Sequence, residues 1–243
     1  MFAFKLWSKF GVFRDPITIT QNITLPIPPK TTVGGILAAI IGLDYNKYFQ
    51  DENYFNFIYS VVLSKEIRKK SFAQNYVMDY TKKSEAKLTV FSSIEKNMDK
   101  IFTKMAYPKP IFREILLDPE YLIFVDGFKY ETEIIELLTK HQSVYPLYMG
   151  NSEFAANYES IMCENFKEKS VDVLDSFTEQ GDKIKFEPGK KYTKVYAATK
   201  VRENREYRDY KDVVVSNGKI CFKKKITCLA IETQYGEFNC EFI

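Results

Sequence analysis

The stretch PIPPKTTVGGILAAIIGL, residues 26–43, restricts the possible folds of this chain more than any other part of the sequence. Its three prolines fix their own φ angles and keep the residues before them extended, so a helix can begin only after Pro29. The apolar residues that follow have the spacing of one buried helical stripe, namely Val33, Ile36, Leu37, Ile40 and Ile41. We therefore predict a helix that is capped by Thr31 or Thr32 and packs one face on a core.

Gly34 and Gly35 fall in the predicted first turn of this helix, where each costs about 1 kcal/mol of helix stability relative to alanine. Either the glycines let the helix pack closely on a sheet, or they let a ligand approach the backbone. A helix N-terminus with free N–H groups beside Lys30 would suit a phosphate. The stretch lacks the Gly-Lys-Ser/Thr ending of a P-loop. The residues alone leave both explanations open.

The composition indicates a folded protein. A chain of 243 residues with 45% hydrophobic residues can form one large domain or two small ones. The longest apolar run, residues 33–43, is far shorter than the ~20 residues of a membrane helix, and the N-terminus has no signal-peptide core. The four cysteines show no CxxC spacing and there is one histidine, so we expect buried free thiols, no metal site and no cofactor. A cytoplasmic protein that does not contact a membrane is the expectation.

Charge is distributed unevenly along the chain. Residues 110–180 carry 14 acidic and 5 basic side chains, whereas residues 65–109 carry 11 basic and 5 acidic ones. Residues 181–243 are again basic, with 14 basic and 9 acidic side chains. The basic blocks could follow a nucleic-acid backbone and the acidic block could face a basic protein, although solvated faces would give the same counts.

The remaining patterns predict alternating strands and helices followed by a β-rich end. We expect strands at residues 2–6 and 121–125, a second helix or a buried segment at 51–64, a helix at 131–140, another helix after a cap at Asn151 or Ser152, and a hairpin at Asn217-Gly218. The lysine-rich residues 65–107 lack a clean period and are interpreted as a long hairpin that leaves the main fold. The predicted class is an α+β fold of ferredoxin-like type, with a core at residues 1–180 and a β-rich extension of the same fold at 181–243.

Three stretches occur in a familiar order between residues 25 and 161: LPIPPKTTVGGILAAIIGL, YPKPIFREILLDPEYLIFV and HQSVYPLYMGNSEFAANYESI. They resemble the three signature sequence blocks of CRISPR-associated protein five, a RAMP-superfamily subunit of type I Cascade complexes. The sequences of these stretches are most similar to the type I-B branch of the family. The last 80 residues are similar only in being β-rich and basic. The resemblance implies a ferredoxin-like, RRM-related core with a protruding thumb.

The resemblance also implies a function. Members of this family bind the 5′ handle of the CRISPR RNA (crRNA), cap the backbone filament and contact the large subunit, so we expect this chain to be a non-catalytic subunit of such a complex. The ribonucleoprotein complex then uses the guide to find target DNA in antiviral defence.

A single-stranded handle is held by cations on its phosphates, aromatic rings on its bases and backbone donors beside small residues. On that basis we expect RNA contacts from Arg14, Lys30, Thr31, Thr32, Gly34, Gly35, Lys69, Lys70, Lys82, Lys83, Lys109, Arg113, Tyr145, Tyr148 and Gly150. Several have simpler explanations. Arg113 could form a surface ion pair with Glu114, the two tyrosines could be core or rim residues, and Gly150 could only close a turn.

The alternative function is a metal-independent endoribonuclease that processes precursor crRNA, as relatives in the type I-C branch do. Such an enzyme needs acid–base groups, and His141 has Lys140 and Tyr145 near it in sequence. A lone histidine after a helix is more often a cap or an exposed polar residue, so we favour the non-catalytic function. A single-stranded RNA-binding module unrelated to CRISPR is the third alternative.

Overall fold

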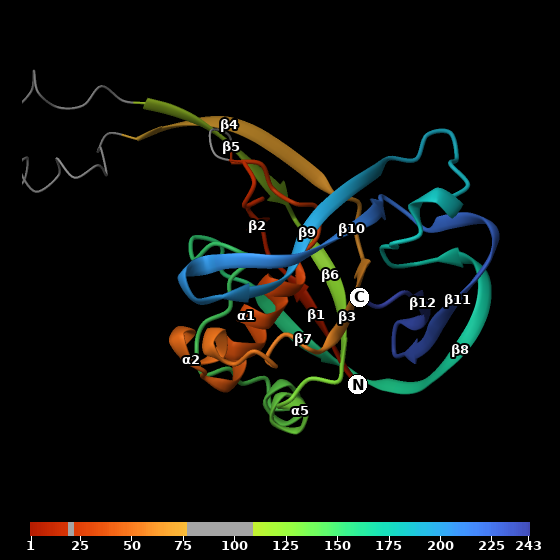
Figure 1. The fold of residues 1–243 in the computed structure, drawn as a ribbon, viewed down its shortest axis with the longest axis horizontal. Helices are drawn as coiled ribbons and strands as arrows, with labels where there is room; N and C mark the ends of the chain where they lie inside the picture. The colour runs from red at the N-terminus through yellow and green to blue at the C-terminus, as the bar shows by residue number, and fades with distance from the viewer. Residues whose placement is uncertain (19–21, 77–108) are drawn as a thin grey trace, which may run out of the picture.

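The computed structural model describes residues 1–18, 22–76 and 109–243, and its strands far outnumber its helices (Figure 1). Within these residues a four-stranded antiparallel sheet has the order β3-β6-β1-β7. Its strands are β1 (Phe2–Trp7), β3 (Ile58–Leu63), β6 (Glu120–Asp126) and β7 (Asn157–Ile161). The predicted strands at 2–6 and 121–125 are both confirmed.

Both faces of this central sheet are buried. One face packs on helices α1 (Lys30–Ile41) and α5 (Glu131–Thr139), and the other packs on strands β11 (Ile220–Thr233) and β12 (Gly236–Cys240). Alternate residues of β6 therefore join different clusters, with Ile123 on the helix side and Phe124 on the strand side. A strand buried on both faces reads as a continuous apolar run, which explains the sequence YLIFV.

A second antiparallel sheet projects from the body (Figure 1). It has the order β2-β5-β4, with β2 at Phe10–Gly11, β4 at Arg68–Tyr76 and β5 at Lys109–Leu117. β4 and β5 pair over their whole length, from Arg68↔Leu117 to Tyr76↔Lys109. The expected hairpin is thus confirmed at its base, but its return strand β5 lies beyond the predicted residues 65–107. Lys82 and Lys83 lie outside the described residues.

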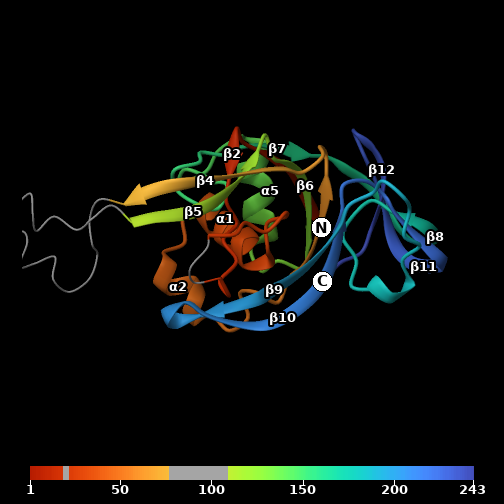
Figure 2. The same cartoon turned by 90° about the horizontal axis from the view of Figure 1, so that it is seen from above.

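The C-terminal third is β-rich, as expected. A two-stranded ribbon, β9 (Tyr192–Arg202) and β10 (Glu206–Ser216), lies over α1, and β8 (Cys163–Leu174) pairs with β11 in the order β12-β11-β8 (Figure 2). Short helical segments complete the described chain: α2 (Tyr45–Gln50), η2 (Gly181–Lys183) and η3 (Glu203–Arg205). None of the described helices is long and apolar enough to cross a bilayer.

The prediction that Thr31 or Thr32 caps α1 is wrong. The helix begins at Lys30 and Pro29 is its N-cap, which makes no side-chain capping bond. The Pro29 carbonyl instead accepts the N–H groups of Thr32 and Val33, at 2.8 and 3.0 Å. Helical bonding thus starts as soon as the last proline permits, which places Gly34 and Gly35 in the second turn. The apolar stripe is confirmed, with only Ile41 left partly exposed.

Three other local predictions need correction. Residues after Gly150 form no helix, because Met149 N–H donates to the Phe154 carbonyl and the chain turns directly into β7. For residues 51–64 we predicted a helix or a buried segment. The helix is wrong and the buried segment is confirmed, because residues 58–63 form strand β3. Asn217-Gly218 is a turn but not a hairpin, because β10 pairs with β9 and β11 pairs with β8 and β12.

The four cysteines are free thiols. Cys228 and Cys240 are buried, as expected, whereas Cys163 and Cys221 are partly exposed.

The two glycines of α1 have different surroundings. A Cβ on Gly34 would lie 2.4 Å from Cε1 of the buried Phe55 ring, whereas the nearest atom to a Cβ on Gly35 is the Tyr48 hydroxyl at 3.9 Å. Close packing therefore requires glycine at position 34 only. Of the two explanations left open by the sequence, this supports packing at Gly34.

Gly34→Ala and Gly35→Ala are expected to change stability in opposite directions. Overpacking against Phe55 should lower the free energy of unfolding by about 1–3 kcal/mol. At position 35 alanine should raise it by up to about 1 kcal/mol, because helix propensity improves without a clash. Urea unfolding of both variants measures the difference, and equal stabilisation by both would contradict the packing role of Gly34.

Candidate nucleic-acid interface

The three sequence blocks meet at residues 10–14. Leu25 N–H of the first block donates to the Phe13 carbonyl at 2.8 Å, and Val12 N–H donates to the Met149 carbonyl of the third block at 3.0 Å. The second block joins through β5, whose Leu116 lies opposite Gly11 in the β2–β5 register. Stretches more than 100 residues apart in sequence are thus held by one short backbone segment.

Gly150 is fixed by this junction. Its φ is +87° and a Cβ there would lie 1.8 Å from the Val12 carbonyl oxygen. Only glycine fits both the left-handed conformation and this approach. Protein packing therefore accounts for Gly150, and its contact with RNA stays a prediction.

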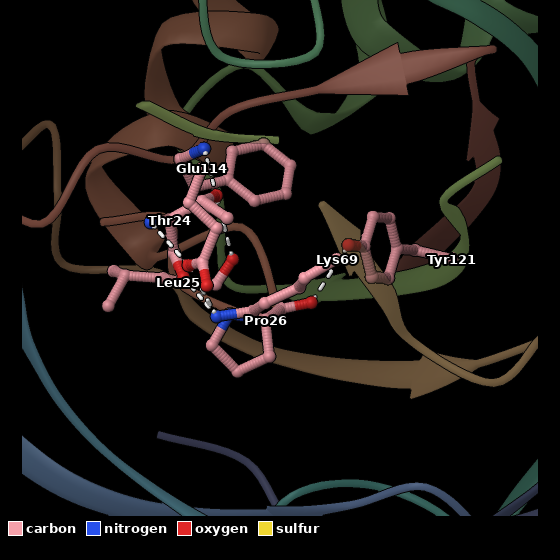
Figure 3. Close-up of polar contacts among 7 residues, drawn as sticks. Thr24, Leu25, Pro26, Lys69, Glu114 and Tyr121 are labelled. Atoms are coloured by element: carbon pink, nitrogen blue, oxygen red, sulfur yellow. Dashed lines mark hydrogen bonds and ion pairs between the residues drawn. The ribbon is translucent and has the colours of Figure 1, made fainter. Parts of the chain in front are cut away.

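Lys69 binds protein groups at the base of the hairpin (Figure 3). Its ammonium donates to the Thr24 carbonyl at 2.5 Å and lies 3.0 Å from Oε2 of Glu114, which also accepts the Thr24 N–H at 3.0 Å. This cluster ties β4 and β5 to the segment that leads into the prolines. The Lys69 ammonium therefore already binds a carbonyl and a carboxylate of the protein, unlike a lysine whose ammonium is free to bind a phosphate.

Buried tyrosine hydroxyls bind the carbonyls of the first block. Tyr121 donates to the Pro26 carbonyl at 2.8 Å (Figure 3), and Tyr54 donates to the Gly34 carbonyl at 2.8 Å. Burial raises the pKa of both phenols above the ordinary value, so they remain neutral donors. These bonds satisfy carbonyl groups that the core would otherwise leave unpaired.

Lys30 lies in the interior and not on an open surface. The residue is 7% exposed, its ammonium is 5.2 Å from the centroid of the Phe57 ring, and the described residues offer it no carboxylate partner. Burial, with smaller contributions from the charges of Lys211 and Lys200, lowers the pKa of this ammonium to about 8. Thr31 and Thr32 are half-buried beside it. A phosphate contact of these three residues stays a prediction.

Lys30→Met should stabilise the protein at pH 7, because it removes a buried charge without a counter-ion. The folded pKa is below the unfolded value of 10.5, so the unfolded state binds more protons between about pH 8 and 10.5 and wild-type stability should rise with pH there. The advantage of the variant should accordingly shrink by roughly 3 kcal/mol across that window. Urea unfolding at pH 7 and pH 10 tests this, and a variant that is less stable at pH 7 would show that the charge is compensated.

Arg113 is buried, and its partner is not Glu114. Its Nη1 lies 2.8 Å from Oε2 of Glu153, and its guanidinium carbon lies 5.4 Å from the centroid of the Phe154 ring. Glu114 instead faces Lys69, because successive residues of a strand point to opposite faces. The alternative explanation, a surface pair of Arg113 with Glu114, is therefore wrong, because Arg113 holds the third block against β5. Its contact with RNA stays a prediction.

One face of the β2-β5-β4 sheet remains accessible at its base. Residues that are directly opposite or two apart in the register share a face. Phe10, Arg68, Lys70 and Phe72 lie on the face that also carries Arg113. We call these four residues the hairpin-base face; all are exposed, and Arg68 is paired with Asp118. The ring of Phe10 lies 6.3 Å from that of Phe154, so the loop of the third block borders this face.

The predicted site residues thus fall into two groups: some already contact other protein groups, and others remain exposed. Lys70 on the hairpin-base face and Arg14 are exposed cations without a side-chain partner in the described part of the chain, and Tyr145 and Tyr148 are exposed aromatics. Lys109 begins β5. Phe10 and Phe72 are not among the predicted site residues, although alternation along RKKSFAQNY places a phenylalanine two residues after Lys70.

The family model described as "CRISPR-associated protein (Cas_Cas5)" matches residues 1–211. The chain belongs to the CRISPR-associated Cas5 family. This confirms the resemblance of the three sequence blocks, whereas the type I-B assignment stays a prediction. No curated protein matches the chain.

Solved structures match the chain at low sequence identity, and the first of them shows a similar fold. A chain of a "CRISPR RNA-guided surveillance complex" is 13% identical with a TM-score of 0.50, and the match covers 93% of this Cas5 chain and 90% of that one. A second match, "Crystal structure of Cas protein", is 13% identical with a TM-score of 0.45 and covers 91% and 95%. A third, "Cryo-EM structure of the Type III-B Cmr-beta bound to cognate target RNA and AMPPnP, state 1", is 13% identical with a TM-score of 0.45 and covers 90% and 86%.

Proposed function

We propose that this Cas5 chain is a non-catalytic subunit of a type I, I-B-like, Cascade complex and binds the 5′ handle of the crRNA on the hairpin-base face. Family membership supports the place in a CRISPR effector complex. The observation that carries the handle site is the combination of Lys70, which has no side-chain partner among the described residues, with exposed Phe10 and Phe72 on one sheet face at the junction of the three blocks. Cations for phosphates beside rings for bases are the groups that a splayed single strand requires.

The core that carries this site is, in this proposal, ferredoxin-like. The order β1-α1-β3-β6-α5-β7 along the chain and β3-β6-β1-β7 across an antiparallel sheet supports that topology. The hairpin of β4 and β5 would then be the thumb inserted between β3 and β6. Residues 1–180 form the core in this proposal, and residues 181–243 form a β-rich extension of the same fold.

The acidic block supports the proposed protein partners, which are the backbone filament subunit and the large subunit. On α5, Glu133 and Glu136 are exposed on either side of the exposed Ile135. An apolar residue between carboxylates fits a basic protein surface better than a nucleic acid. In this account RNA and protein bind different faces, and target DNA is reached through the assembled complex.

Phe72→Leu and Lys70→Gln should weaken binding of a labelled RNA that carries the handle. Loss of one stacking ring should cost about fivefold or more in affinity, with little change in salt dependence. Lys70→Gln should reduce the slope of log affinity against log salt by about 0.7, because one phosphate contact is lost. Lys47→Gln, at an exposed lysine of α2, is the matched control. Equal affinity for all four proteins would contradict the handle site.

The endoribonuclease alternative is tested on the same protein. The His141 ring stacks on Tyr158 at 4.6 Å between centroids, and Lys140 lies 2.5 Å from Glu136, so both groups already contact protein. Uncut precursor RNA incubated with the purified chain in EDTA should stay intact. Cleavage that His141→Ala abolishes would replace the non-catalytic proposal with a processing nuclease.

A further inference from the structure

Residues 181–191 and 219–226 lie at the end of the molecule opposite to the β4–β5 hairpin (Figure 1 and Figure 2). Residues 181–191 and 219–226 contain eight lysines and two carboxylates. The two segments are adjacent, because Ile184 bridges Phe222 and Lys185 N–H donates to the Cys221 carbonyl at 2.8 Å. We call residues 181–191 and 219–226 the lysine lobe. A small apolar core that includes Ile184 and Phe222 holds it together.

Three of these lysines are displayed by a bulge in β11. Cys221 lies opposite Val173 of β8, and Ile226 lies opposite Val171. The four residues 222–225 of β11 therefore lie opposite the single residue Asp172 of β8, and the extra residues of β11 do not pair with β8. All three lysines in this bulge are exposed, namely Lys223, Lys224 and Lys225. Bulges of this kind re-aim side chains and are built features rather than defects.

Much of this charge is not neutralised within the described residues. Lys190 pairs with Glu187 and Lys219 pairs with Asp175. In contrast, Lys185, Lys224 and Lys225 have no ion pair or side-chain hydrogen bond in the described part of the chain, and the same holds for Lys191. A surface with several unpaired lysines favours a polyanion and repels a basic protein.

An exposed aromatic ring lies within the lobe. Phe186 follows Lys185 directly and is 63% exposed, although it is among the most apolar side chains. The edge contact of its ring with Tyr192, at 5.0 Å between centroids, holds it in place. A fixed ring among unpaired cations can stack on a base while the lysines bind the flanking phosphates. A duplex would not offer an unstacked base to this ring.

We propose that the lysine lobe is a second nucleic-acid site that binds a single strand through its phosphates and one stacked base. This site is separate from the hairpin-base face and does not depend on handle recognition. Binding involves phosphate charge and a base face, so we expect little sequence preference and strong salt dependence.

The test measures the affinity of the full chain for a labelled oligothymidylate over a range of salt concentrations. Lys223→Gln/Lys224→Gln/Lys225→Gln should reduce the slope of log affinity against log salt by about 2, because up to three phosphate contacts are lost. Phe186→Leu should weaken binding by about fivefold or more with an unchanged slope. Phe166→Leu is the matched control, because Phe166 is 61% exposed on β8 outside the lobe.

Handle RNA is titrated in parallel with the same variants in the presence of excess unlabelled oligothymidylate, which occupies the lobe, and the remaining handle binding should be unaffected by changes in the lobe. Oligothymidylate binding that is equal for wild type and the lobe variants would overturn the second site, whatever happens to the handle. Effective competition by an unlabelled duplex, together with no effect of Phe186→Leu, would overturn the single-strand assignment. Loss of handle binding alone would affect only the function proposed above.

Discussion

Backbone hydrogen bonds from residues 12 and 13 hold together parts of the chain that are distant in sequence. Val12 N–H donates to the Met149 carbonyl of the third block, and the Phe13 carbonyl accepts the N–H of Leu25 in the first block. Because these are main-chain contacts in a crowded site, they require the small residue Gly150 beside Val12 and leave little room for side-chain change. The β4–β5 hairpin, its accessible face and the proline-led helix all take their positions from this junction.

The proposed binding surfaces differ in how they are built. On the hairpin-base face, Phe10 and Phe72 are presented by strands whose other residues are occupied by the Lys69–Glu114 and Arg113–Glu153 pairs. These ion pairs within the protein position the sheet. The side chains of the hairpin-base face that take no part in them are the ones available to a ligand. The lysine lobe instead relies on local density of charge and on a bulge. Two surfaces at opposite ends of the molecule can thus serve different strands.

The sequence predicted the elements whose periodicity is strong. Phe2, Phe4 and Leu6 form the buried side of a strand, and the apolar stripe after Pro29 forms a helix, because burial of one face selects a single register. Predictions based on local signals were less reliable. Asn217-Gly218 does turn the chain, but strand pairing is decided by distant residues, so it joins two different sheets.

The site residues were harder to predict for a related reason. Sequence shows that Lys30, Lys69 and Arg113 are cations, but it does not show that Phe57, Glu114 and Glu153 lie against them. The exposure of Lys70 and Arg14 is what the charge of these residues predicts, whereas the exposure of Phe10 and Phe72 is not, because phenylalanine is usually buried.

The most direct test of the handle site is photocrosslinking in the assembled complex. The chain is co-expressed with its neighbouring subunits and a guide whose handle carries 4-thiouridine, and crosslinked peptides are identified by mass spectrometry. Crosslinks to the peptides that contain Phe10 and Phe72 are the predicted result. Handle crosslinks confined to other subunits, or to surfaces of this chain away from the hairpin-base face, would contradict it.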